Sequence, residues 1–365
     1  MKEYHRLVAE INLDAIGENI RNIRTQIEPK TQLLAIVKAD AYGHGALEVS
    51  RVCLYNGANQ LAVATCDEGV ALRESSIQVP ILILGNTVEA EMEAMIKNRL
   101  TQAVFDYDIA KKISETAQRL NMTALVHIKI DTGMHRIGFA PTEENLDEID
   151  KIFELPNIEV TGIFTHFATA DEKDKTYTRE QFEKFKFMTD GVEARGHKGL
   201  IRHCANSGAI LDMPELQMDM VRAGIIIYGL YPSTEVSTDV KLVPAMSVKT
   251  QVSYVKYLEA GESVGYGRTY FTDKRTKIAT IPIGYADGYS RRLSNKCMVD
   301  VTNVPDIKVG DEVVIMGKSG DKEVSCEEIA NTVGTINYEI VCNVGKRVPR
   351  AFVKNGQVVY TVKAI

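Results

Sequence analysis

The sequence lacks several features that would direct it to a membrane, to secretion or to a metal. It has no apolar run near the roughly 20 residues that a membrane-spanning helix needs, and its N-terminus, MKEYHRLVAEINLD, lacks the apolar core of a signal peptide. Its 6 cysteines contain no C-x-x-C pair. Without a secretion signal, we expect reduced thiols and a cytoplasmic protein. H-x-x-x-H is also absent, so we predict no metal site.

A basic surface is lacking as well, because the formal net charge is -6 and no Lys/Arg stripe stands out. We therefore predict neither a nucleic-acid nor a membrane partner. Hydrophobic residues make up 45% and charged residues 25% of the chain, which is typical of a soluble globular protein. Its 365 residues exceed what one core usually organises, so two domains are expected.

The first two thirds of the chain alternate short apolar runs with longer amphipathic ones. The runs are continuous rather than alternating, as expected for parallel strands that are buried on both faces. Eight β-then-α units predict an α/β fold, a (β/α)8 TIM-like barrel. An open doubly wound sheet is the weaker alternative, because no G-x-G-x-x-G follows the first strand. The expected strands are 31–38, 61–65, 80–84, 101–105, 124–130, 158–165, 200–206 and 218–222, and clear helices are expected at 87–98, 108–120 and 142–155.

After Pro232 the pattern changes. STEVSTD indicates a linker, and the rest is rich in strands and turns. We predict a barrel domain over 1–232 and a mostly β C-terminal domain over 233–365. This prediction allows the first few residues of the chain to pair with the second domain.

Lys38 ends the first predicted strand, in AIVKADAYGHGA. Active sites of barrels lie at the carboxyl ends of the strands. A lysine there is usually a solvated charge. In this case two glycines permit close backbone approach and Tyr42 adds a hydroxyl. A desolvated lysine has a lowered pKa and becomes a nucleophile for an aldehyde.

The run VKADAYGHG resembles the lysine motif that binds pyridoxal 5′-phosphate (PLP) in bacterial alanine racemases. The resemblance implies a PLP-binding barrel followed by a β domain, interconversion of L- and D-alanine for peptidoglycan, and a homodimer with shared active sites. Further similar motifs are KIDTGMHRIGF (129–139), THFATAD (165–171), HCANSGA (203–209), MVRAGIIIYG (220–229), VGYGRTY (264–270), IPIGYADGYSR (281–291) and GTINYEIVC (334–342).

Two residues match the family's catalytic bases. The resemblance implies that Lys38 binds the cofactor and then exchanges the Cα proton on one face, while Tyr266 acts on the other face. An ordinary tyrosine pKa of about 10 is too high for this task. By analogy, the cations His166 and Arg222, which the resemblance also assigns to cofactor binding, lower the pKa of this tyrosine. Taken without the resemblance, Tyr266 is interpreted as a half-buried aromatic residue of a strand. Its two flanking glycines weaken that interpretation, because glycine weakens an ordinary strand.

Arg222 lies among apolar residues in the eighth predicted strand and needs a partner there. A structural salt bridge is one possibility. The other, implied by the resemblance, is the pyridine nitrogen of PLP, which an arginine keeps unprotonated, so that the cofactor is a weaker electron sink.

The resemblance also assigns the remaining site residues. The donors to the cofactor phosphate are Tyr42, Ser207, Gly224, Ile225 and Tyr338. The substrate contacts are Arg136, Tyr266 and Tyr285. Lys129 matches a lysine that is carbamylated in many relatives, where the carbamate would brace Arg136. A simple pair with Asp131 is the alternative.

One departure from the family pattern lies between Lys296 and Cys297. Relatives carry a hairpin and a Gly-Arg-x-Cys-Met-Asp turn there, whereas YSRRLSNK runs directly into CMVDVT in this chain. Met298 is therefore given no substrate role. Loss of that turn would remove a backbone donor to the substrate carboxylate and lower affinity on the order of 10- to 100-fold.

Three other functions remain open. A racemase that prefers serine differs only by one hydroxyl in its substrate, which a small pocket rejects weakly. A decarboxylase of this architecture would carry a different cysteine-bearing loop. A PLP-binding carrier that does not racemise would resemble the barrel alone, and VGYGRTY in the added β domain argues against it.

Overall fold

The computed structural model describes residues 6–293 and 297–363. The described chain forms two compact units. The barrel unit comprises residues 16–41 and 45–243, and the second unit comprises the chain up to Ala15, Tyr42–His44 and the chain from Pro244 onward.

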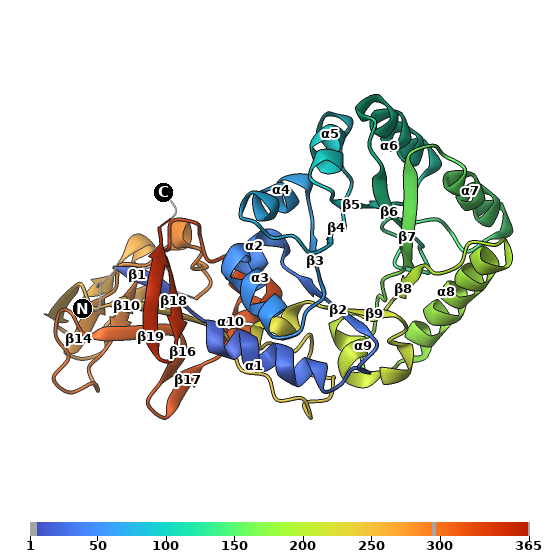
Figure 1. Ribbon diagram of the computed structural model, residues 1–365. Helices are drawn as coiled ribbons and strands as arrows, with labels where there is room; N and C mark the ends of the chain where they lie inside the picture. Colours follow the sequence, from blue (N-terminus) through green and yellow to red (C-terminus); the bar gives the residue numbers. More distant parts are fainter. Residues whose placement is uncertain (1–5, 294–296, 364–365) are drawn as a thin grey trace. The chain divides into compact units, whose positions relative to one another are not determined.

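The barrel unit contains the predicted eight-stranded parallel sheet, in the order β8-β7-β6-β5-β4-β3-β2-β9, with its helices outside the strands (Figure 1). Backbone bonds from Asp219 N to Arg202 O (3.1 Å) and from Arg222 N to Ala205 O (3.0 Å) link the two end strands. The predicted barrel is therefore confirmed. Its strands are β2 (Gln32–Ile36), β3 (Gln60–Val63), β4 (Ile81–Ile83), β5 (Thr101–Val104), β6 (Ala124–Lys129), β7 (Ile158–Phe164), β8 (Ile201–His203) and β9 (Met220–Ala223).

Burial explains why these strands are continuous apolar runs, since every residue of β3, β4, β5 and β9 is buried. The helix predicted over 142–155 begins at a side-chain cap, in which the Thr142 hydroxyl accepts from Asn145 N. The helices of this part of the chain are α1 (Leu13–Arg24), α2 (Lys38–Gly43), α3 (Ala46–Tyr55), α4 (Cys66–Glu74), α5 (Glu89–Lys97), α6 (Tyr107–Leu120), α7 (Glu143–Phe153), α8 (Thr176–Ala194) and α9 (Ser207–Asp212).

The segment 233–243, predicted as the start of the second domain, packs with the barrel unit instead. Buried Asn19 in α1 donates to Ile227 O and Val243 O, both at 2.9 Å, and accepts from Val243 N at 2.8 Å. A side-chain amide that bridges two backbone segments in this way ties the end of the segment to the barrel helix.

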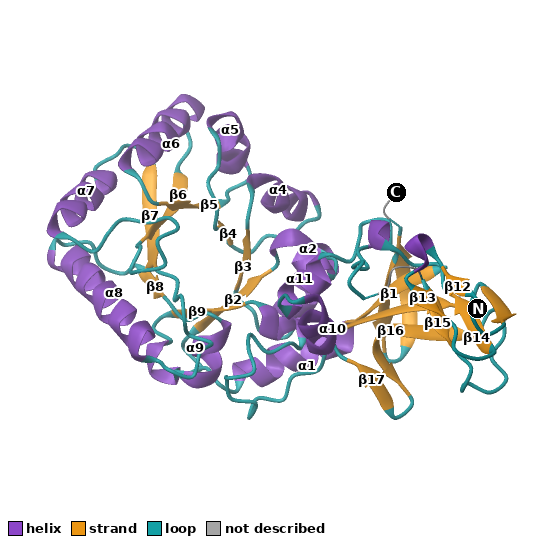
Figure 2. Ribbon diagram, turned by 180° about the vertical axis from the view of Figure 1, so that it is seen from behind, coloured by secondary structure: helices purple, strands orange, loops and turns teal. Residues whose placement is uncertain are grey.

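The second unit is rich in strands, as predicted (Figure 2). Its largest sheet has the order β17-β16-β10-β1-β18-β19, so the N-terminal strand β1 pairs with β10 and β18. These strands are β1 (Leu7–Asn12), β10 (Met246–Gln251), β16 (Glu312–Ser319), β17 (Lys322–Val324), β18 (Arg350–Lys354) and β19 (Gln357–Val362).

A three-stranded sheet and a short hairpin complete the strands of this unit. The sheet is β11 (Tyr254–Leu258), β14 (Thr276–Thr280) and β15 (Met298–Asp300), and the hairpin is β12 (Ser263–Val264) and β13 (Tyr270–Phe271). Two helices that the strand pattern did not predict are also present: α10 (Cys326–Val333), capped by the Ser325 hydroxyl, and α11 (Asn337–Cys342). Across the described residues, no helix is both long and apolar enough to span a bilayer.

Candidate active site

Lys38 follows the carboxyl end of β2 and begins α2. The single turn that follows it is left-handed: φ lies between 51° and 53° at Ala39, Asp40, Ala41 and Tyr42. A left-handed conformation costs an L-residue roughly 1–2 kcal/mol. Strained backbone of this kind, held at the end of a barrel strand, marks the position as a candidate functional site.

Neighbouring carboxylates hold this turn in place. Glu68 in α4 accepts from Ala39 N at 2.6 Å and, through its other oxygen, from Ala64 N at 2.7 Å. Asp40 accepts from Ala46 N at 2.7 Å. These charge-assisted bonds offset part of the cost of the left-handed turn and fix the backbone beside Lys38.

This backbone geometry predicts an unusual response to glycine. In a right-handed helix, Ala→Gly costs roughly 0.5–1 kcal/mol. At exposed Ala39 in the left-handed turn, Ala39→Gly removes steric cost, so we expect unchanged or slightly higher stability. The matched control is exposed Ala71 in α4, where Ala71→Gly should lower the urea midpoint. Equal losses of stability in both variants would contradict this account of the turn.

Arg222 in β9 is buried, and all its hydrogen bonds are donated by its two terminal nitrogens. One terminal nitrogen donates to His203 Nδ1 (3.1 Å) and His203 O (3.0 Å). The other donates to Thr165 O (2.8 Å), His166 Nδ1 (3.0 Å) and Cys204 O (3.1 Å). The described hydrogen bonds of Arg222 leave its Nε–H unused.

No ion pair in the described part of the chain includes Arg222, so the salt-bridge interpretation is not supported. Its acceptors are carbonyls and imidazoles. Burial is the main reason that the pKa of Arg222 falls to about 10, which still leaves it a cation at neutral pH. Burial and the adjacent Arg222 hold the pKa of His166 well below its usual range. His166 is therefore a neutral hydrogen-bonding group and not the cation that the family analogy suggested.

Lys129 is buried at the end of β6. Its ammonium donates to Ile130 O at 2.5 Å and to Ile137 O at 3.2 Å. Asp131, the expected ion-pair partner, instead accepts from two backbone N–H groups of the following loop, at Gly133 and His135. Burial lowers the pKa of Lys129 to about 7, so its amine is partly neutral near physiological pH.

Ser207 and Gly224 meet where α9 and the turn after β9 begin. The Ser207 hydroxyl accepts from Gly224 N at 3.0 Å, and both residues are buried. The Gly224 N–H, predicted to bind a phosphate directly, is thus already used. Ser207 retains its own hydroxyl proton to donate, and Ile225 follows directly at the start of the 3-10 turn Ile225–Tyr228.

Tyr42 and Tyr338 lie together in the second unit, with an edge-to-face ring contact whose centroids are 6.1 Å apart. Tyr42 is buried, and burial raises the pKa of its hydroxyl. It therefore stays protonated and acts only as a neutral donor or acceptor. The structure thus brings together the two tyrosines that the sequence assigned to the cofactor phosphate.

Tyr266 and Tyr285 also belong to the second unit, and both are on its surface, with 89% and 79% of their area exposed. Tyr266 lies in a 3-10 turn between β12 and β13, not in a strand. The glycines on either side have φ of 71° and 74°, so the turn itself requires glycine there. Among the barrel residues, Arg136 is exposed, in the loop after Lys129.

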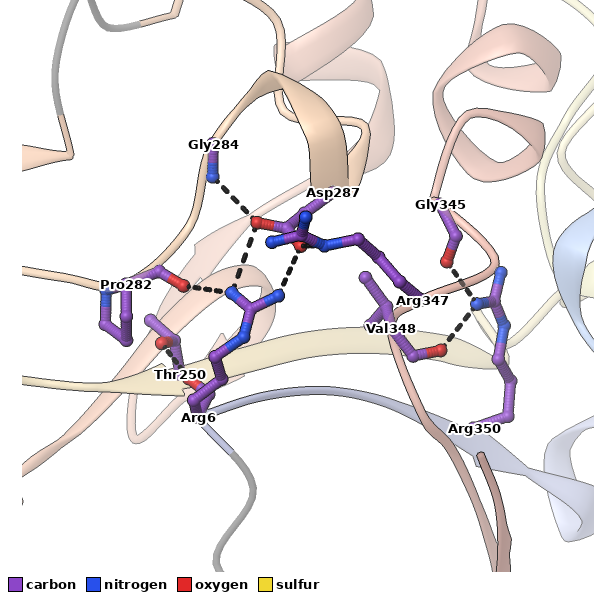
Figure 3. Close-up of polar contacts among 9 residues, drawn as sticks. All are labelled: Arg6, Thr250, Pro282, Gly284, Asp287, Gly345, Arg347, Val348 and Arg350. Carbon is purple, nitrogen blue, oxygen red and sulfur yellow. Dashed lines mark hydrogen bonds and ion pairs between the residues drawn. The ribbon is translucent and has the colours of Figure 1, made fainter. Parts of the chain in front are cut away.

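Buried Asp287 anchors the turn that presents Tyr285 (Figure 3). Its carboxylate accepts from Arg6 at 2.6 Å, from Arg347 at 2.7 Å and from Gly284 N at 3.0 Å. These bonds keep the pKa of Asp287 below its usual range although burial opposes them. Asp287 was not predicted as a site residue from the sequence.

Two buried histidines, His127 and His203, were given little weight in the sequence, yet they extend the contacts of Arg222. The sequence does contain one indication that His127 lies near the site. His127 and Lys129 are two residues apart in a strand, so their side chains share one face of β6.

Family models match both units. The model of the alanine racemase N-terminal domain matches residues 11–232. The C-terminal domain model matches 245–297 and 295–352. The alanine racemase of Clostridium tetani is 46% identical over 373 aligned positions, covering 96% of each chain.

Solved structures agree with these matches. The alanine racemase of Clostridium difficile 630 has a TM-score of 0.95 at 42% identity and covers 99% of each chain. A histidine racemase from Leuconostoc mesenteroides has a TM-score of 0.88 at 26% identity over 97% of this chain.

The matches over both units, together with the barrel, its strand-end lysine and the following β unit, assign the chain to the amino-acid racemases of the barrel class. The chain belongs to the alanine racemase family.

The comparisons also bear on the short junction. The match to the C-terminal domain model is split at 295–297. The alignment with the C. tetani protein is longer than this 365-residue chain although it covers 96% of it. That relative therefore has residues that this chain lacks. The junction from Lys296 to Cys297, with its Cα–Cα distance, lies partly outside the described residues.

Proposed function

We propose that the protein interconverts L- and D-alanine with PLP bound through Lys38, with Lys38 and Tyr266 as the two bases. The observation that carries the proposal is Lys38, held by a strained and braced turn at the end of β2 in a chain of this family.

The barrel residues fit the cofactor. The pyridine nitrogen of PLP is a suitable acceptor for the unused Nε–H of Arg222. The anionic cofactor also suits this cation, because the acceptors around Arg222 are neutral. The remaining proton of Ser207 suits a phosphate. Ile225 N–H, Tyr42 and Tyr338 are the further proposed donors, and Gly224 acts through Ser207.

PLP held by these residues would supply an electron sink that makes the Cα proton of the substrate acidic. The Lys38 amine removes that proton from D-alanine, or returns it to form D-alanine. Tyr266 removes the proton from L-alanine, or returns it to form L-alanine, on the opposite side of Cα. Neutral His166 offers its Nε2–H to the tyrosine oxygen, since its Nδ1 accepts from Arg222. Arg136 and Tyr285 are proposed to bind the substrate carboxylate and to shape the pocket.

We further propose a head-to-tail homodimer in which Tyr266 of one subunit reaches the barrel of the other. The large exposed fraction of Tyr266 supports this, because a tyrosine base must be shielded from water in the working enzyme. A cytoplasmic location is supported by Cys53, Cys66, Cys204, Cys297 and Cys326, which are free thiols. The product D-alanine is proposed to supply peptidoglycan synthesis.

Borohydride mapping tests the cofactor assignment. The purified protein with PLP should be yellow, and borohydride should fix the cofactor on the peptide that contains Lys38. Labelling of any other lysine instead would refute the assignment.

The lowered pKa of Lys129 predicts a pH-dependent carbamylation of its amine. A carbamate forms from the neutral amine and CO2, and a pKa of about 7 leaves that amine mainly neutral above pH 7. We expect 13C-bicarbonate to give one carbamate signal that weakens as the pH falls below about 7. Lys129→Arg should abolish the signal, while a variant of exposed Lys151 should retain it. A signal unchanged by Lys129→Arg would exclude this site.

A further inference from the structure

A chain of neutral groups leads from Arg222 into the wall of the barrel. Arginine only donates hydrogen bonds, so His203 Nδ1 must accept from Arg222 at 3.1 Å. A neutral imidazole then carries its proton on Nε2. That proton points to His127 Nδ1, 3.0 Å away. His127 is the acceptor at the end of this chain, so its own proton is also on Nε2.

Packing holds both rings where this chain of hydrogen bonds requires them. The His203 ring stacks on Phe164 with centroids 4.8 Å apart and an angle of 6°, and His127 meets His203 edge-on. Lys129 and Arg222 both lie over the same Phe164 ring, at 5.7 and 5.5 Å from its centroid. Burial and the nearby Arg222 cation oppose protonation of either imidazole, because they lower the pKa of both histidines.

The backbone makes room for His127 in particular. The register between β6 and β7 shifts after Val126, so that His127 faces Gly162. A Cβ on Gly162 would lie 2.7 Å from the His127 ring. The irregularity and the glycine together create a space that fits an imidazole.

We propose that His127 is a positioning residue that accepts the Nε2 proton of His203 and thereby keeps His203 Nδ1 available to Arg222. Arg222 is then oriented by acceptors that carry no negative charge, and its cation remains uncompensated for the ring nitrogen of the cofactor. A carboxylate in place of His203 would neutralise it. The inference rests on the proposed function for the role of Arg222, but the tautomer of His203 does not depend on that function.

Imidazole 15N NMR on histidine-labelled protein tests the proposal, and the chain has only 7 histidines to assign. We expect His203 and His127 to be neutral Nε2–H tautomers throughout about pH 5 to 8. His127→Phe removes the acceptor and should convert His203 to a mixture or to the Nδ1–H tautomer. His127→Asn places an amide oxygen where Nδ1 was and should restore the Nε2–H tautomer. Gly162→Ala should act like His127→Phe by displacing the ring.

Racemisation provides the second measurement. His127→Phe should lower kcat on the order of 10-fold, and His127→Asn should recover most of it. The control is His197→Phe, since His197 stacks on Phe153 and bonds to Asp150 on another part of the barrel unit. It should change neither the His203 signals nor kcat.

The outcomes separate the two proposals. A His203 that is Nδ1–H or doubly protonated in the unaltered protein overturns the role of His127, as does an Nε2–H tautomer that survives both His127→Phe and Gly162→Ala. If His127→Phe does not fold, Gly162→Ala and His127→Asn still decide the matter. Failure of borohydride to label Lys38 would instead refute the proposed function and leave the tautomer result standing.

Discussion

Lys38→Ala is expected to reduce alanine racemisation by at least about 10³-fold in both directions, because one residue supplies both the covalent attachment and one base. The phosphate and ring-nitrogen partners are separate residues, so we expect the variant still to bind PLP, more weakly. Optical rotation of L- and D-alanine, followed to equilibrium, measures the loss.

The matched control is Lys30→Ala, which removes an exposed lysine of the same unit. It should leave the rate unchanged. If Lys38→Ala retained a tenth of the activity or more, Lys38 would not be a base of this reaction.

Tyr266→Phe is expected to slow proton abstraction from L-alanine by about 10²–10⁴-fold and to affect D-alanine far less, because the two bases act on opposite faces of Cα. Single-turnover exchange of the Cα proton with deuterium, started from each enantiomer, separates the two steps. Equal slowing of both exchanges would contradict the assignment of faces.

Tyr270→Phe is the control for this substitution, since Tyr270 is an exposed tyrosine of the adjacent strand β13. Mixing provides a second check. If active sites are shared, Lys38→Ala and Tyr266→Phe subunits should together regain about a quarter of the normal activity after exchange, from the one intact site in each mixed dimer. A fully active monomer in sedimentation would refute sharing.

The barrel strands were predictable because parallel strands covered on both faces must be apolar throughout, and their sequence runs match β2 to β9 closely. The cap at Thr142 was predictable because its hydroxyl acts on the local backbone. Local patterns were therefore sufficient for most of the barrel architecture.

Features that depend on distant contacts were not predictable. The left-handed turn after Lys38 is stabilised by Glu68, from a helix later in the chain. STEVSTD (233–239) indicates a linker, yet the segment 233–243 packs with the barrel unit and Asn19 binds its end. His127 is an ordinary strand residue until Gly162 and His203 are placed against it. Tertiary partners determine each of these features, and a single sequence does not pair them.

The short junction before Cys297 has a consequence for substrate binding. A lost backbone donor to the alanine carboxylate should raise KM on the order of 10- to 100-fold, without preventing PLP from binding. An ordinary KM, in protein whose intact mass matches the 365-residue sequence, would show that the turn found in relatives is dispensable here.

The most direct test of the central claim is to incubate the purified protein with PLP and either L-alanine or D-alanine, with L-serine in parallel. We predict that each alanine enantiomer converges to the same equal mixture and that alanine reacts faster than serine. Faster conversion of serine would assign a serine racemase. PLP fixed at Lys38 with no change in the optical rotation of any of the three amino acids would contradict racemisation and leave a cofactor-binding protein.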